Sequence, residues 1–100
     1  MYNKPMNQKL AEIKNKVMPI LIEDGVIRSS IFGSYVRGDD TKDSDVDVLV
    51  ELPKGRSLLD LVRLQRKLGQ ALSKKVDLLT YNSISPLLQD YIQRDQVQIL

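Results

Sequence analysis

The sequence predicts an α/β (α+β) fold in which helices pack on a small mixed β-sheet. Helix-like and strand-like periodicities alternate along the chain, 42% of the 100 residues are hydrophobic, and no repeat or low-complexity tract interrupts the pattern. A chain of this length builds one hydrophobic core and has no room for a second one. We therefore expect residues 1–100 to form a single domain.

The first half of the chain contains one predicted helix and two predicted strands. Apolar residues recur at helical spacing over residues 7–23, which indicates an amphipathic helix with a kink at Pro19. The segment "VIRSSIFG" at 26–33 is typical of a strand. A second strand is predicted at 45–52, where "DVDVLVEL" alternates between two faces.

The second half continues the alternation of helices and strands. A helix is predicted from Ser57 to about residue 73, with Ser57 as its N-cap and Asp60 closing a capping box. The segment 75–80 is expected to form a short strand, and Ser85 with the following proline begins another helix. The C-terminal "VQIL" is expected to add an edge strand.

Composition excludes several kinds of chemistry. The chain has no cysteine and no histidine, which excludes disulfides, thiolate zinc sites and nucleophiles activated by histidine. Fifteen basic residues against 13 acidic ones give a net charge of +2 without a basic cluster, so nucleic acid is not an expected partner. Because no apolar run approaches the roughly 18 residues of a membrane span and the N-terminus has no apolar signal-like segment, we expect a soluble, cytoplasmic protein.

Two aspartates lie on one face of the strand at 45–52. Side chains two positions apart point the same way, so Asp45 and Asp47 project together with Cα atoms roughly 6.6 Å apart. At an effective dielectric of 20, two unit charges at this distance repel by about 2.5 kcal/mol. Solvent at the edge of a sheet could offset this repulsion. A divalent cation such as Mg²⁺, which prefers carboxylate oxygens, could also offset it.

The segments around this pair favour a site for phosphate and metal. Gly33 at the end of the first strand lets the backbone approach an anion, and Ser34 is expected to cap a short following helix, so the two predict a phosphate cradle. Asp77 lies between apolar neighbours in the strand at 75–80. If the helix at 57–73 is a right-handed crossover between parallel strands, Asp77 comes beside the pair. Three carboxylates and a phosphate loop suit a two-metal site for phosphoryl or nucleotidyl transfer.

The segment "GSYVRGDDTKDSDVD" resembles the nucleotidyltransferase signature, in which Gly-Ser is followed after ten residues by Asp-x-Asp. The alternating strand and the later Asp77 extend the resemblance to nearly the whole chain. With these features the chain resembles the minimal nucleotidyltransferase (MNT) family, whose domains resemble the palm core of DNA polymerase β. The resemblance implies a mixed sheet of about four strands. The positions that match the signature are Gly33, Ser34, Asp45 and Asp47.

The resemblance also implies an ATP-dependent reaction with two Mg²⁺ ions. The residues that would hold the triphosphate are Gly33, Ser34 and Arg37. The residues that would bind the metals are Asp45, Asp47 and Asp77, and the last would also help to deprotonate the attacking hydroxyl. Without a ligand, Arg37 is expected at the surface or paired with a solvated acidic loop that carries Asp39, Asp40 and Asp43.

The resemblance also suggests a partner, because proteins of this family and size often pair with small helical HEPN toxins, and the nucleotidyltransferase then serves as an antitoxin that adenylylates a tyrosine of the toxin. This transfer of AMP is the function that the resemblance favours. Two alternatives remain. The chain could be a non-catalytic antitoxin that neutralises its partner by contact, or it could transfer nucleotides to a small molecule or RNA.

Overall fold

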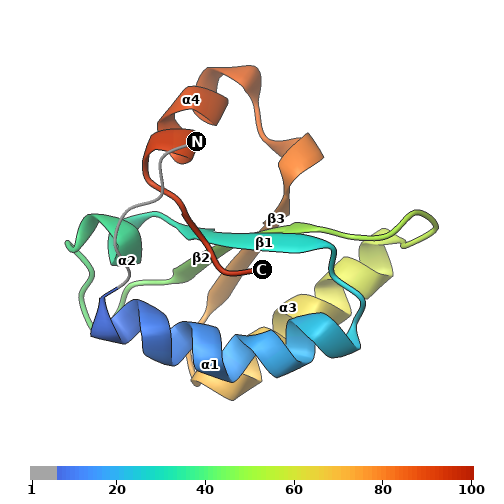
Figure 1. The fold of residues 1–100 in the computed structure, drawn as a ribbon, viewed down its shortest axis with the longest axis horizontal. Coiled ribbons are helices and arrows are strands. Elements are labelled where there is room, and N and C mark those ends of the chain that lie inside the picture. Colours follow the sequence, from blue (N-terminus) through green and yellow to red (C-terminus); the bar gives the residue numbers. More distant parts are fainter. Residues whose placement is uncertain (1–6) are drawn as a thin grey trace.

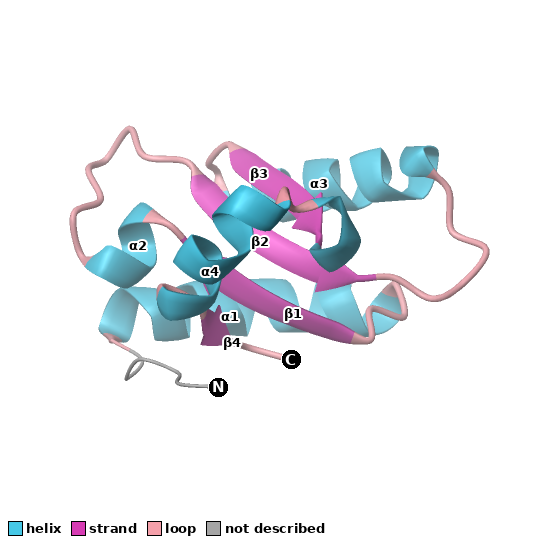
Figure 2. Ribbon diagram, turned by 90° about the horizontal axis from the view of Figure 1, so that it is seen from above, coloured by secondary structure: helices cyan, strands magenta, loops and turns pink. Residues whose placement is uncertain are grey.

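The computed structural model describes residues 7–100 as a four-stranded mixed sheet with helices on both of its faces (Figures 1 and 2). The sheet has the strand order β3-β2-β1-β4. Its strands are β1 (Arg28–Phe32), β2 (Val46–Glu51), β3 (Val76–Thr80) and β4 (Val97–Gln98). The helices are α1 (Gln8–Glu23), α2 (Ser34–Arg37), α3 (Leu58–Leu72) and α4 (Pro86–Arg94), and η1 (Tyr81–Ser83) is a single 3₁₀ turn.

Helix ends follow the capping signals of the sequence. The amide of Asp60 donates to Ser57 Oγ at 3.4 Å, and Asp60 Oδ2 accepts from the Ser57 amide at 2.9 Å, so the predicted capping box of α3 is confirmed. Ser85 caps α4, as predicted, through a bond from the Leu87 amide. α1 begins after Asn7, whose side chain accepts from the Leu10 amide. The structured segments differ from the predicted ones by one or two residues at most ends, where helices and strands fray.

The main core lies between the sheet and the pair α1 and α3, which cover the same face (Figure 1). The helices contribute side chains at the spacing of an amphipathic helix, and the central strand contributes alternate residues. The fully or almost fully buried members from α1, α3 and β2 include Leu10, Val17, Leu21, Leu64, Leu68, Val46, Val48 and Val50. α4 lies over the opposite face of the sheet (Figure 2). None of the helices between residues 7 and 100 is long and apolar enough to cross a membrane.

The direction of the strands places the aspartates together. β2 runs antiparallel to β1 and parallel to β3, with α3 as the connection between the parallel strands. In the register of the parallel pair, Asp47 lies opposite Asp77. The prediction that a helix connects two parallel strands is therefore confirmed. β4 pairs antiparallel with β1 at the edge of the sheet, as expected for the C-terminal segment.

Candidate active site

The candidate site lies at one end of the sheet, where β1 ends and β2 and β3 begin. Phe32 at the end of β1 pairs with Asp47, and Asp47 pairs with Asp77. Phe32, Asp47 and Asp77 therefore lie side by side on three neighbouring strands. Phe32 is followed directly by the turn at Gly33, which precedes α2. A turn and two carboxylates that are far apart in the sequence therefore meet at one edge.

Gly33 has a conformation and a neighbour that only glycine tolerates. Its φ is 82° and its ψ is −150°, a region of the backbone map that is essentially restricted to glycine. A Cβ atom at this position would overlap with Oδ2 of Asp47. The missing side chain thus leaves the space in which the Asp47 carboxylate lies against the backbone.

The prediction that Ser34 caps the helix was wrong. The N-cap of α2 is Gly33, whose carbonyl oxygen accepts from the amides of Val36 at 3.0 Å and Arg37 at 3.1 Å, and Ser34 is the first helical residue. The positive φ of Gly33 turns the chain into the helix without a side-chain cap, so the hydroxyl of Ser34 is not used for capping. Ser34 remains partly exposed beside the turn.

The three predicted aspartates lie close together but not equivalently. Asp47 and Asp77 are neighbours in β2 and β3, whereas Asp45 directly precedes β2. All three side chains are partly exposed. Since Val46 and Val48 are fully buried in the core, the alternation of the strand directs Asp47 to the opposite face.

The electrostatic environment of Asp47 disfavours its ionised form. Burial, the negative charges of Asp77 and Asp45, and a hydrogen bond with the Asp77 carboxyl together raise the pKa of Asp47 to about 6, and the charge of Arg37 acts in the opposite direction. A carboxyl group that holds its proton this strongly marks a place where negative charge is not fully compensated. Such a place suits a cation or a proton transfer.

Asp45 has a partner that the sequence reasoning missed. Lys75 Nζ lies 3.8 Å from Asp45 Oδ2, with the lysine well exposed and the aspartate partly exposed. The parallel register sets Val46 opposite Val76, so the residues that precede them come together. The signal was present in the sequence once β2 and β3 were taken as parallel.

Carboxylate oxygens are the ligands that Mg²⁺ prefers, and the donor set at this edge therefore fits the metal in its chemistry. As the side chains stand between residues 7 and 100, no three carboxylates lie close enough together to hold one ion. Asp47 lies opposite Asp77 in the parallel register, while Asp45 is paired with Lys75. Of the three predicted ligands, Asp47 and Asp77 are therefore direct neighbours. Asp45 is close enough for its negative charge to act on Asp47.

The loop after α2 differs in part from the expected solvated loop. Arg37 Nε lies 3.3 Å from Asp39 Oδ2, which confirms the expected surface ion pair. The exposure of Asp43 also agrees with the prediction. Asp40 does not, because its side chain is 8% exposed and accepts a hydrogen bond of 2.8 Å from Lys9 Nζ. The bond from Lys9 is the main reason that the pKa of Asp40 is lowered.

Comparison with known proteins identifies the family. The nucleotidyltransferase domain family matches residues 12–98. The chain belongs to this family. A candidate protein adenylyltransferase of Methanocaldococcus jannaschii is 56% identical over 89 residues, which cover 89% of this chain and 96% of that protein.

Two further matches agree with this assignment. Protein adenylyltransferase MntA of Thermococcus cleftensis is 37% identical over 75 residues, which cover 75% of this chain and 76% of that protein. A crystal structure of a toxin–antitoxin with AMP-PNP has a TM-score of 0.77 at 27% identity and covers 87% of this chain and 72% of the matched chain. The chain is a nucleotidyltransferase of the MntA-like protein adenylyltransferase group, and the predicted family and fold are confirmed.

Proposed function

We propose that this nucleotidyltransferase moves AMP from ATP to a tyrosine hydroxyl of a small helical HEPN-type toxin, and so acts as an antitoxin in the cytoplasm. The observation that carries the proposal is the meeting of Asp47 and Asp77, which pair in the register of β2 and β3 beside the turn at Gly33. The toxin–antitoxin among the structural matches supports the choice of partner.

The chain's own residues divide the work of binding. The positive φ of Gly33 turns the chain into α2, and its missing side chain lets the Asp47 carboxylate lie against the backbone beside the proposed triphosphate. Ser34 lies in the first turn of α2, and its hydroxyl and amide would donate to phosphate oxygens. Arg37 at the end of α2 adds positive charge near Asp47. We assign these three residues to the triphosphate.

The carboxylates serve the reacting end of the nucleotide. We assign Asp45 and Asp47 to two Mg²⁺ ions, and Asp77 to the ion near the acceptor. When bound, the two ions neutralise phosphate charge and make the acceptor hydroxyl more acidic. The acceptor oxygen forms a bond to the α-phosphorus, the bond to the bridging oxygen breaks, and pyrophosphate leaves. Asp77 would help to remove the proton of the hydroxyl.

One observation favours a second candidate function. Because no three carboxylates between residues 7 and 100 are close enough to hold a metal ion as they stand, the chain could neutralise a toxin by contact alone. The two functions make opposite predictions for a variant that keeps the fold and loses one carboxylate.

The deciding experiment incubates the purified domain with labelled ATP, Mg²⁺ and the HEPN-type partner, and compares Asp47→Asn with the matched control Asp43→Asn on the exposed loop. We expect Asp47→Asn to lower AMP transfer by about 100-fold or more, as when a group that stabilises transition-state charge is removed. The control should keep full transfer. Retained transfer in Asp47→Asn would contradict the site. Full neutralisation of the toxin without transfer would establish the contact-only antitoxin instead.

A further inference from the structure

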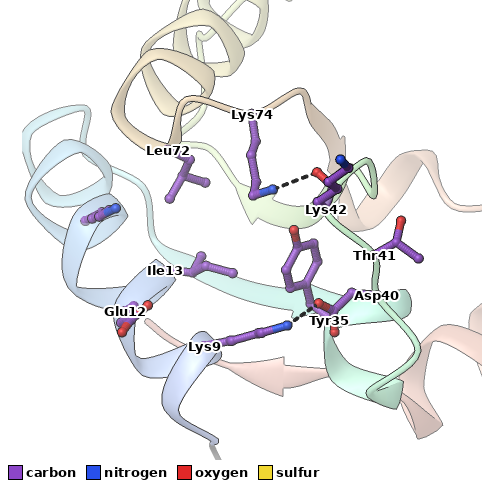
Figure 3. A pocket seen from close by; sticks show the side chains of 10 residues that line it. Lys9, Glu12, Ile13, Tyr35, Asp40, Thr41, Lys42, Leu72 and Lys74 are labelled. Atoms are coloured by element: carbon purple, nitrogen blue, oxygen red, sulfur yellow. Dashed lines mark hydrogen bonds and ion pairs between the residues drawn. The ribbon is translucent and has the colours of Figure 1, made fainter.

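A cavity lies on the other face of the sheet from the aspartates. It has a volume of about 320 Å³ and is formed by the N-terminal half of α1, by α2 and the loop after it, and by the end of α3 (Figure 3). The aspartates point to the face opposite the buried valines of β2, whereas α1 and α3 cover the valine face. The cavity is therefore separate from the proposed active site.

The cavity has an apolar floor and a basic rim. Its floor is made by Ile13, Tyr35 and Leu72, each less than one-tenth exposed. Four lysines and two carboxylates line the remainder, which leaves an excess of two positive charges. The lysines are Lys9, Lys16, Lys42 and Lys74, and we call this site the lysine cavity.

Two lysines at the rim, Lys9 and Lys74, have different partners. Lys9 is paired with Asp40 at 2.8 Å. Lys74 Nζ instead donates to the backbone carbonyl of Lys42 at 3.1 Å and lies 6.0 Å from the centroid of the Tyr35 ring. A carbonyl group and a ring hold the ammonium in place, and the Asp40 carboxylate, which is already paired with Lys9, lies within range of its charge.

The view into the cavity shows Lys74 and Lys9 on opposite sides of Tyr35 (Figure 3). The hydroxyl end of the tyrosine points toward the Lys74 side. An anion that enters would thus meet a fixed ammonium group beside an apolar floor. Lysine binds phosphate as a point charge, and a cavity of this volume is at the lower end of the range for small organic ligands.

We propose that the lysine cavity binds a phosphate ester of mononucleotide size, with its phosphate at Lys74 and its ring against the floor formed with Tyr35. The ligand would touch Tyr35 directly. Because Tyr35 follows Ser34 in α2, such a ligand would also brace the helix that carries the proposed triphosphate contact. The site is additional to the proposed transfer reaction and does not depend on it.

The test measures binding of AMP and UMP to the full chain in EDTA, which removes binding that requires a divalent metal. We expect at least one of the two to bind at low millimolar concentration or tighter, and to bind at least about tenfold more tightly than inorganic phosphate. Amide resonances of residues 9–16 and 72–74 should shift on binding, and those of β3 should not.

Variants decide whether Lys74 holds the phosphate. Lys74→Gln should weaken binding by about tenfold or more, the scale of one charge-assisted hydrogen bond. The matched control Lys54→Gln removes the same charge at an exposed position outside the cavity and should change nothing. Three results would each overturn the proposal. The first is a dissociation constant above about 5 mM for both nucleotides. The others are inorganic phosphate that binds as tightly as the nucleotides, and a Lys74→Gln variant that binds them no more weakly than the control.

Discussion

The two faces of β2 differ in what they contribute to the protein. On one face Val46, Val48 and Val50 are fully buried against α1 and α3, where apolar burial stabilises the fold. On the other, Asp47 is partly buried beside Asp77 and Asp45, which disfavour its charge. Along this one strand, the valines stabilise the fold and the aspartate between them belongs to the proposed active site. A substitution should therefore act on one property or on the other, depending on the face.

The largest effect is expected on the valine face. Val48→Asn loses the burial of an apolar side chain and leaves an amide unpaired in the core, so the free energy of unfolding should fall by about 3–5 kcal/mol. Asp47→Asn introduces the same residue on the opposite face and should leave this free energy unchanged or higher. Urea denaturation followed by circular dichroism measures both, and equal losses would contradict the separation of the two faces.

A smaller loss is expected where the backbone approaches the aspartate face. Gly33→Ala places a methyl group on the Asp47 carboxylate and strains a backbone with φ of 82°, so we expect a loss of about 2–3 kcal/mol in stability. Gly38→Ala is the matched control, because its φ is 84° and a Cβ there would meet no atom within 4 Å. It should cost about 1 kcal/mol. Thermal or urea unfolding of both variants provides the comparison, and similar losses would exclude the contact with Asp47.

The aspartate face should also be visible in the pH dependence of stability. The folded pKa of Asp47 is about 6 and its ordinary value is 3.8, so the folded state binds this proton more tightly than the unfolded state. The stabilisation is complete below about pH 4 and is lost as the pH rises through about 6. Because the group is partly solvated, we expect a loss of about 1–2 kcal/mol. The stability of the parent chain minus that of Asp47→Asn, measured from pH 4 to 7 without metal, isolates this group. A difference that stays flat or rises would contradict the raised pKa.

An effect no larger than the pH-dependent one is expected at Ser34, on ligand binding alone. Ser34→Ala should weaken ATP binding in Mg²⁺ by about 1–2 kcal/mol, the scale of one hydrogen bond to a charged group. Stability should not change, because Ser34 does not cap α2. Ser44→Ala, which removes the hydroxyl that accepts from the Thr41 amide in the neighbouring loop, should keep ATP affinity. Calorimetry with ATP compares the two variants. Equal affinities in both would remove Ser34 from the triphosphate site.

Local patterns in the sequence predicted much of the fold and the meeting of the aspartates. The alternation around Asp47 set its face, and the helix between two strand-like segments indicated the parallel pairing that brings Asp77 beside it. The capping box at Ser57 fixed the start of α3. Each of these features depends on residues a few positions apart or on one connection, so periodicity and turn chemistry are enough to reveal them.

Features that depend on packing between distant segments were not predictable in this way. Asp40 was expected in a solvated acidic loop, yet Lys9, 31 residues earlier, pairs with it. The lysine cavity likewise requires α1, α2 and the end of α3 to be placed together. The error at Ser34 has a different cause, since the positive φ of Gly33 replaces a side-chain cap by a backbone turn.

The register of the parallel strands links correct folding to the proposed reaction. Val46 lies opposite Val76, and Asp47 lies opposite Asp77. A slip of one residue would turn the valines of β2 to water and the aspartates into the core, so a misaligned chain would lose both its core and its carboxylate pair together. Activity per mass of protein should therefore be proportional to the fraction of molecules whose strands pair in the correct register. It should fall along the same heating curve as the sheet signal, with no inactive but fully folded fraction.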